Sequence, residues 1–169
     1  MRFTDFLSED CICPDLRARD RSGVLHELAG MLAARSRAPV QQLEAQLEAR
    51  ERISSTAIGE GVAIPHCRSE RLRQMTVCVA VDPEGVDFGA RDGRPVRLFV
   101  TLASPTHAPG THLNVLARIA ALLRDSRLRQ ALVEAPSAAA IHALLVKAED
   151  AYLSGQSRQD ASAHHVSGP

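Results

Sequence analysis

The chain has 169 residues, and its 20 basic and 20 acidic side chains give a formal net charge of 0. This balance argues against a general nucleic-acid binder, because such proteins usually carry a basic surplus. Aromatic residues make up 3% of the chain, with no Trp. Few rings are therefore available for stacking on bases or sugars, and the core must be built from aliphatic side chains.

The amino-terminal segment MRFTDFLSED has acidic residues where a secretory signal needs an apolar stretch, and no apolar run is long enough to span a bilayer. We therefore expect a cytoplasmic protein without membrane insertion. The four cysteines, Cys11, Cys13, Cys67 and Cys78, form no CxxC pair, which is typical of reduced thiols that pack as small apolar residues.

The first half of the chain predicts two helices followed by short strands. Apolar residues at helical spacing indicate a helix over 22–36 with Ser22 as its N-cap. A second amphipathic helix has Pro39 in its first turn and continues towards Arg50. Glycines then punctuate short strands, and β-branched residues predict a buried strand over 75–82.

The second half predicts a hairpin and then further helices. The Asp92-Gly93 pair is typical of a turn between two strands, here over 86–88 and 96–102. Three helices follow: one capped by Thr111, one over 128–133 and one over 137–147.

Helices first, a cluster of strands in the middle and helices last predict an α/β fold, in which a mixed parallel and antiparallel β-sheet is flanked by helices. The hairpin argues against an all-parallel, doubly wound sheet. We expect a single domain over residues 1–150. The polar tail over 151–169 is rich in Gly and Ser, and we expect it to be disordered.

His66 is the first candidate functional residue. It follows the apolar run Val62-Ala63-Ile64 and Pro65, at the point where a buried strand would end. Glycines at 59 and 61 allow close backbone approach, and the fixed φ of Pro65 limits movement of the loop. These features predict a positioned imidazole, although a histidine that merely makes one backbone hydrogen bond at a strand end fits the same pattern.

The segment RERISSTAIGEGVAIPH, from Arg50 to His66, resembles the active-site signature of the mannitol/fructose-type IIA domains of the bacterial phosphoenolpyruvate-dependent phosphotransferase system. This family includes the nitrogen-regulatory IIA proteins. Its pattern is an Arg-Glu pair, a Ser/Thr-Thr-Gly-Ile-Gly turn and a Gly-Ile/Val-Ala-Ile/Val-Pro-His end. Downstream, DGRPVRLFVTLASP and THLNVLARIAALLRD match the family's order of strand, loop, His-Leu and helix. The resemblance covers about residues 3–148.

The resemblance implies that His66 accepts a phosphoryl group from the phospho-histidine of a small HPr-like protein. At neutral pH much of an imidazole with a pKa of about 6.5 is free base and nucleophilic. Arg50 aligns with the family's active-site arginine and His112 with its second histidine, and both suit the charge on phosphoryl oxygens. Glu60 aligns with an acidic residue of mannitol-type members, where nitrogen-regulatory members often have Asn. Thr56 matches the motif's threonine, which would hydrogen-bond near the site.

Each of these residues also has a structural interpretation. Arg50 favours the negative pole at the end of its helix, His112 fits an exposed first turn, and Glu60 fits a solvated turn. Two positions depart from the family pattern. Ala57 replaces a glycine and removes some backbone freedom, and Cys67 follows the histidine either as an oxidisable surface neighbour or as a buried thiol.

A metal site is the rival chemistry. The potential ligands His66, His107, His112 and Cys67 contain no close pair such as CxxC or HxxxH. The context SPTH of His107 does not match the family, and His164-His165 lies in the polar tail. We therefore expect neither a metal nor a cofactor.

The leading hypothesis is a phosphocarrier rather than a free-standing turnover enzyme. In the nitrogen-regulatory branch the phosphorylation state controls bound partner proteins, and in the sugar-transport branch the group passes to a cysteine of a IIB domain. A free-standing domain with a helical amino-terminal part favours the regulatory branch, whereas Glu60 favours the transport branch. The alternative of another class is a regulatory binding module that never carries phosphate.

Overall fold

A computed structural model describes the backbone of residues 1–164 and the side chains of residues 1–156. In this part of the chain, six strands form one sheet in the order β1-β5-β6-β3-β2, with β4 also paired to β6. The strands are β1 (Ile12–Cys13), β2 (Ala57–Gly59), β3 (Val62–Ala63), β4 (His66–Ser69), β5 (Thr76–Val86) and β6 (Val96–Pro105).

The antiparallel hairpin β5–β6 forms the centre of the sheet, as the turn signal predicted. Strands β3 and β4 run parallel to β6, and β1 runs parallel to β5, whereas β2 is antiparallel to β3. The predicted mixed sheet is therefore confirmed. The separate short strand predicted over 86–88 is instead the end of β5, because Val86 pairs with Val96 and Phe88 leaves the strand to become a fully buried core residue.

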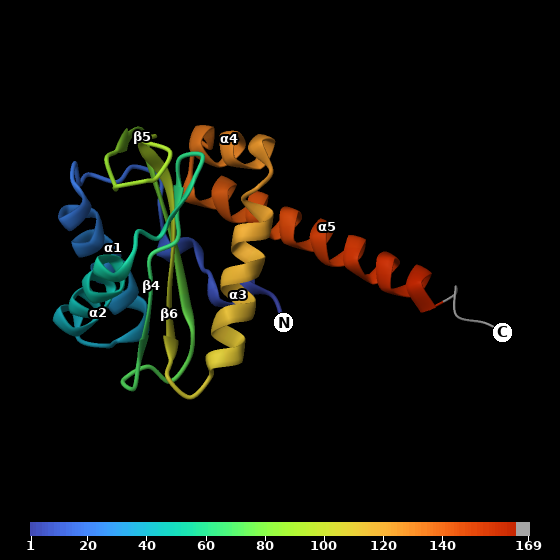
Figure 1. The fold of residues 1–169 in the computed structure, drawn as a ribbon, viewed down its shortest axis with the longest axis horizontal. Coiled ribbons are helices and arrows are strands. Elements are labelled where there is room, and N and C mark those ends of the chain that lie inside the picture. Colours follow the sequence, from blue (N-terminus) through green and yellow to red (C-terminus); the bar gives the residue numbers. More distant parts are fainter. Residues whose placement is uncertain (165–169) are drawn as a thin grey trace.

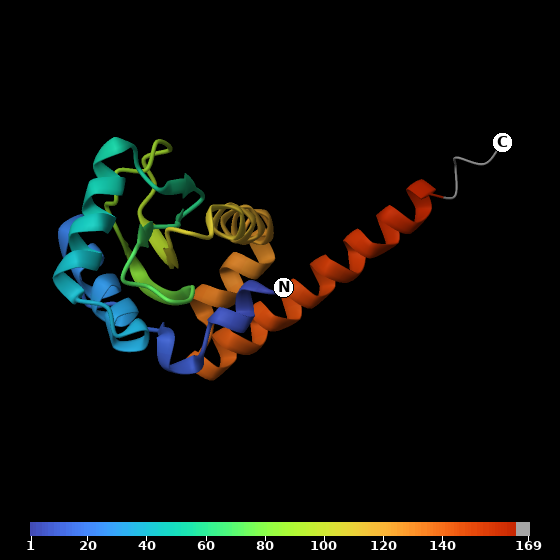
Figure 2. The same ribbon diagram turned by 90° about the horizontal axis from the view of Figure 1, so that it is seen from below.

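Helices cover both faces of the sheet (Figures 1 and 2). Helices α1 (Arg21–Ser36) and α2 (Val40–Ile53) pack together on one face, and α3 (Pro109–Leu122), α4 (Ser126–Glu134) and the first part of α5 (Ala138–His164) lie on the other. Two short 3₁₀ turns, η1 (Phe3–Phe6) and η2 (Glu9–Cys11), lead into β1. This cover on both sides explains why β5 and β6 read as nearly continuous apolar runs.

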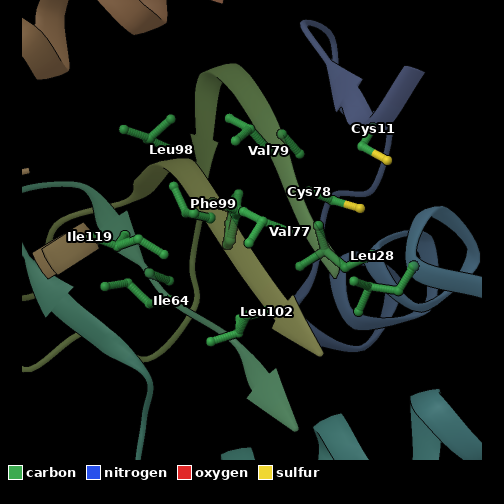
Figure 3. Close-up of a cluster of buried hydrophobic side chains, with 14 of the residues drawn as sticks. Cys11, Leu28, Ile64, Val77, Cys78, Val79, Leu98, Phe99, Leu102 and Ile119 are labelled. Atoms are coloured by element: carbon green, nitrogen blue, oxygen red, sulfur yellow. The ribbon is translucent and has the colours of Figure 1, made fainter. Parts of the chain in front are cut away.

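Aliphatic side chains from both layers fill the core (Figure 3). Leu28 of α1 and Ile119 of α3 approach the central hairpin from its two faces, and both are buried. Ile64 and Leu102 belong to the same cluster. Leu102 is the register partner of His66, and Ile64 lies two residues before His66. Because both are core residues, the core fixes the backbone that carries this histidine.

Two helix starts differ from the sequence prediction. Asp20 rather than Ser22 caps α1, and its Oδ1 accepts a hydrogen bond of 2.7 Å from the backbone N–H of Gly23. Helix α3 begins at Pro109, because a proline in the first turn gives up an N–H that has no helical partner. Thr111, the predicted cap, therefore lies inside the helix.

The last helix is longer than the sequence predicted. Helix α5 continues to His164, so residues 151–164, which we expected to be disordered, are helical in the structure. Ile141 and Leu145 are buried in the core and anchor its first half. Once a helix is nucleated, each added residue gains one backbone hydrogen bond. The Gly and Ser residues of this segment favoured a prediction of disorder, so the sequence did not indicate the extension. Residues 165–169 lie outside the described residues. Among the helices described, none combines the length and apolar character that a membrane crossing requires.

Candidate functional site

Three of the predicted residues line one cavity of about 650 Å³. Arg50 lies in the last turn of α2, His66 begins β4, and His112 lies in the first turn of α3. The parallel pairing of β4 with β6 carries His66 to the place where helices from the two layers approach the sheet. Segments far apart in the sequence therefore meet around one imidazole.

Hydrogen bonds fix the tautomer of His66. Its Nδ1 lies 2.8 Å from the carbonyl oxygen of Ile64, which can only accept, so Nδ1 carries the proton. The Nε of Arg50, which can only donate, lies 3.1 Å from Nε2 of His66. Nε2 therefore holds a lone pair, and this nitrogen is the nucleophilic atom of the ring.

The backbone around His66 is also tied down. The carbonyl oxygen of Pro65 accepts hydrogen bonds from the N–H of Leu102 at 3.0 Å and from Oγ1 of Thr101 at 2.9 Å. The N–H of Ile64 donates to the carbonyl oxygen of Thr56 at 3.0 Å. The imidazole thus stands on a backbone that is bonded on both sides.

The surroundings of His66 favour its neutral form. Burial, the largest cause, lowers the pKa of this half-buried imidazole below its usual value of 6.5. The hydrogen bond to Ile64 opposes this shift, and the positive charge of Arg50 adds to it. At neutral pH Nε2 therefore keeps a lone pair, which accepts the hydrogen bond from Arg50.

His112 is a buried, neutral neighbour of that ring. Its side chain is 5% exposed, and burial together with the charges of His66 and Arg68 lowers its pKa to about 4. The centroids of the two imidazole rings lie 5.4 Å apart, with the planes inclined by 59°. Nδ1 of His112 lies 2.5 Å from Oγ of Ser104, on β6.

Arg50 supplies a positive charge that no carboxylate neutralises. Its Nε faces His66, and its second donor group, Nη1, bonds the carbonyl oxygen of Ser54 at 3.0 Å. Among the residues whose side chains are described, no Asp or Glu lies within ion-pair distance of this guanidinium. An anion entering the cavity would meet a free positive charge beside a nucleophile.

The rim of the cavity is apolar and basic. Ile53 of α2 and Leu113 of α3 both line it and are 81% and 65% exposed, among the few large apolar side chains at the described surface. Arg68 also lines the cavity, and its side chain is exposed. Exposed apolar residues around a polar centre are typical of a surface that another protein covers.

Comparison with known proteins places the chain in a family. The model of the phosphoenolpyruvate-dependent sugar phosphotransferase system, EIIA 2, matches residues 5–148. The chain belongs to this family. The nitrogen regulatory protein of Bradyrhizobium diazoefficiens is 35% identical over 145 residues, which cover 86% of this chain and 95% of that protein. The fructose-specific EIIABC component of Bacillus subtilis is 33% identical over 143 residues, which cover 83% of this chain and 22% of that protein.

A solved structure agrees with this assignment. The nitrogen regulatory protein IIA-Ntr from Neisseria meningitidis matches with a TM-score of 0.81 and 32% sequence identity, covering 85% of this chain and 98% of that one. Both the family resemblance and the predicted fold class are therefore confirmed.

Two further residues of the IIA signature do not line the cavity. Thr56 is buried, its N–H and Oγ1 donating to the carboxylate of Glu51 at 2.8 and 2.6 Å. Glu60 lies in a second group of charges, where its carboxylate pairs with Arg94 at 2.7 Å and with Arg129 at 3.6 Å. The first three residues of the predicted site come together, and these two lie elsewhere.

The structure accommodates the two residues that depart from the IIA pattern, Ala57 without backbone strain and Cys67 without exposure. Ala57 does not have a positive φ, so its Cβ causes no backbone strain in β2. Gly59 and Gly61 have φ of 91° and 77°, which form the tight turn between β2 and β3 rather than the wall of the His66 cavity. Cys67 is buried, and burial raises the pKa of its thiol to about 12, so the buried alternative holds.

The rival metal ligands are not gathered in the described part of the chain. No group of three His, Cys, Asp or Glu side chains there could hold a metal ion. His107 is exposed and does not line the cavity that contains His66 and His112.

Sequence reasoning missed two residues that hydrogen-bond to the predicted candidates. Glu51 was visible only as the second member of the Arg-Glu pair, and the structure shows that it ties the end of α2 to Thr56. Ser104 had no signal in the sequence, because its contact with His112 joins a strand to the next helix.

Proposed function

We propose that this chain is a phosphocarrier of the phosphotransferase system that accepts a phosphoryl group on Nε2 of His66 from an HPr-like phospho-histidine protein. The observation that carries the proposal is the fixed tautomer. The Nδ1 proton is held by the carbonyl group of Ile64, and the Nε2 lone pair accepts a hydrogen bond from Arg50, which lines the same cavity as His66.

The transfer follows from this geometry as an in-line displacement. The lone pair on Nε2 forms a bond to phosphorus, and the bond between phosphorus and the donor's imidazole nitrogen breaks, returning its electron pair to the donor. Arg50 moves its Nε donor from the lone pair of His66 to the oxygens of the arriving group. Phosphoryl transfer needs mainly positioning and stabilisation of charge on those oxygens, which an uncompensated guanidinium provides.

The second imidazole contributes a neutral donor. With its pKa near 4, His112 is uncharged at neutral pH, so it can donate a hydrogen bond to the phosphoryl group without placing a second full charge beside His66.

The test of the chemistry is incubation with phosphoenolpyruvate, enzyme I and an HPr-like donor, followed by intact-mass measurement in alkaline conditions. The wild type should gain one acid-labile phosphoryl group. His66→Ala should gain none, while His107→Ala, which changes an exposed histidine outside the cavity, should behave as the wild type. Equal phosphorylation of His66→Ala would exclude this assignment.

Within the family we propose the nitrogen-regulatory branch, in which the phosphorylation state controls partner proteins. The support is the match over nearly the full length of nitrogen regulatory proteins. In the test, immobilised wild type, phosphorylated wild type and His66→Ala capture partners from a lysate of the source cell. A partner that binds the unphosphorylated forms and not the phosphorylated one supports the branch. Identical partners for all three would indicate a module whose binding ignores phosphate.

The match to a fructose-specific component favours a second candidate function, in which the phosphoryl group passes from His66 to a IIB domain. Mixing the phosphorylated chain with a fructose-type IIB domain tests it directly. Transfer of the group to a IIB cysteine within the mixing time would favour the transport branch, and retention of the group on His66 would favour the regulatory one.

A further inference from the structure

Among the described side chains, Ser104 is the hydrogen-bond partner of the His112 ring. The serine lies near the end of β6 and is fully buried, with 0% of its surface exposed. Its Oγ is 2.5 Å from Nδ1 of His112. Within the residues whose side chains are described, this nitrogen is the hydroxyl's hydrogen-bond partner, and no other acceptor bonds it.

The direction of this bond follows from counting protons. A hydroxyl has one proton to donate, and a buried donor without an acceptor costs about 1–3 kcal/mol. If Nδ1 carried the ring proton, the hydroxyl would only accept, and its own proton would point into the core without a partner. The hydroxyl therefore donates to Nδ1, and the proton of the neutral ring lies on Nε2.

We propose that Ser104 is a positioning residue that holds His112 in the Nε2–H tautomer, so that this ring offers a donor to the phosphoryl group on His66. The proposal rests on the proposed function. Nδ1 is occupied on the sheet side, so the Nε2 edge is the part of the ring left for the cavity that His112 lines. The opposite tautomer would turn a lone pair towards the phosphoryl oxygens and repel them.

A hydrogen bond at Nδ1 fixes the tautomer of both His66 and His112, but the two tautomers differ. An acceptor, the carbonyl group of Ile64, fixes the proton of His66 on Nδ1 and leaves a lone pair on Nε2. A donor, the hydroxyl of Ser104, fixes the proton of His112 on Nε2. One ring thus becomes the nucleophile and the other becomes the hydrogen-bond donor, although both are neutral imidazoles whose centroids lie 5.4 Å apart.

The decisive measurement is the nitrogen NMR spectrum of the imidazole rings in the unphosphorylated, ¹⁵N-labelled wild type at pH 7. We expect Nδ1 of His112 to show the signal of an unprotonated nitrogen and Nε2 that of a protonated one, with the reverse for His66. A protonated Nδ1 in His112 would overturn the proposal. This readout needs no phosphoryl transfer, so it stands apart from the test of the proposed function.

Variants link the tautomer to the reaction. In Ser104→Ala the His112 tautomer should become mixed, and the rate of phosphoryl acceptance should fall on the order of tenfold. This is less than the 10²–10³-fold effect of deleting a preorganised donor outright, because part of the population keeps the useful tautomer. Ser104→Thr keeps the hydroxyl and should restore both the spectrum and the rate.

A matched control separates positioning from packing. Thr76 is a buried hydroxyl residue on the neighbouring strand β5, and it does not line the cavity. Thr76→Val should leave the His112 spectrum and the transfer rate unchanged. If Ser104→Ala also changes neither, or if Thr76→Val lowers the rate as much, the positioning role is refuted.

Discussion

The signature from Arg50 to His66 is continuous in sequence, but it supplies two charged regions with opposite properties. At its ends, Arg50 bonds a neutral imidazole and lacks an acidic partner among the described side chains. In its middle, Glu60 pairs with Arg94 and Arg129 beside a smaller cavity of about 260 Å³. The first region has an unpaired positive charge to offer to an anion, whereas both arginines of the second already lie against a carboxylate.

The backbone of the second region explains its form. Glu60 has a φ of 56°, in the left-handed region, and its N–H donates to the carboxylate of Asp92 at 2.8 Å. The turn thereby holds the strand pair β2–β3 against the turn that follows β5. Arg94 thus meets a carboxylate, whereas Arg50 meets an imidazole lone pair.

The largest effect should come from removing the uncompensated charge. Arg50→Gln should lower the rate of phosphoryl acceptance by His66 by about 10²-fold or more, the cost of losing a preorganised donor to a developing charge. Arg94→Gln, which removes an arginine already paired with Glu60, should leave the rate within about threefold. Quench-flow measurement with a phosphorylated HPr-like donor tests both. Equal losses would show that long-range charge, rather than position, carries the effect.

The burial of His112 predicts a pH dependence of stability. The pKa of His112 falls to about 4 in the folded chain, from 6.5 when unfolded, so between these values the unfolded state binds more protons. The free energy of unfolding should therefore fall as the pH drops from about 6.5 towards 4, by roughly 3 kcal/mol from this residue. His66, whose pKa is also lowered, acts in the same direction.

Urea unfolding of the wild type and of His112→Gln across this pH range checks the prediction. The difference between the two curves should shrink as the pH falls, because the variant lacks the group that resists protonation. His107→Gln, which alters an exposed histidine, should follow the wild type. Parallel curves for all three would show that His112 titrates near its ordinary pKa.

Substitution of Thr56 tests whether the middle of the signature contributes to stability rather than to phosphoryl transfer. Its Oγ1 donates to the buried carboxylate of Glu51 at 2.6 Å, and hydrogen bonds to charged groups contribute about 1.5–3 kcal/mol. Thr56→Val should therefore lower the free energy of unfolding by about 2 kcal/mol, measured in urea at pH 7. The folded fraction should still accept phosphate at nearly the wild-type rate. A large loss of rate in fully folded protein would instead assign Thr56 to the reaction.

The sequence predicted the hairpin, the mixed sheet and the three residues that line the cavity. Asp92-Gly93 and the apolar runs carry local turn and burial signals, and the spacing from Arg50 to His66 carries the family pattern. It did not predict that Glu60 would lie elsewhere. Six residues of extended chain span about 20 Å, so proximity in a motif does not imply proximity in space.

Contacts between separate helices and strands could also not be predicted from the sequence. The bond from Ser104 to His112 depends on the angle at which α3 meets β6, and no local pattern encodes that angle. The extension of α5 to His164 has a similar cause, because the packing of its first turns, rather than the composition of its last ones, determines where the helix continues.

The smallest effect should come from Glu60, and it bears directly on the comparison. Glu60→Gln leaves the size of the side chain but removes its charge, so Arg94 and Arg129 lose their partner while the cavity of His66 is untouched. Phosphoryl acceptance from the HPr-like donor should stay within about twofold of the wild type.

Transfer to a fructose-type IIB domain should be measured beside it, because Glu60 is the position where mannitol-type members carry an acid. A tenfold loss with the IIB domain alone would place the second region in a partner's interface and assign this exposed carboxylate to the transport branch. Unchanged rates with both proteins would leave Glu60 as part of the turn and its ion pairs, and the two regions would then be independent.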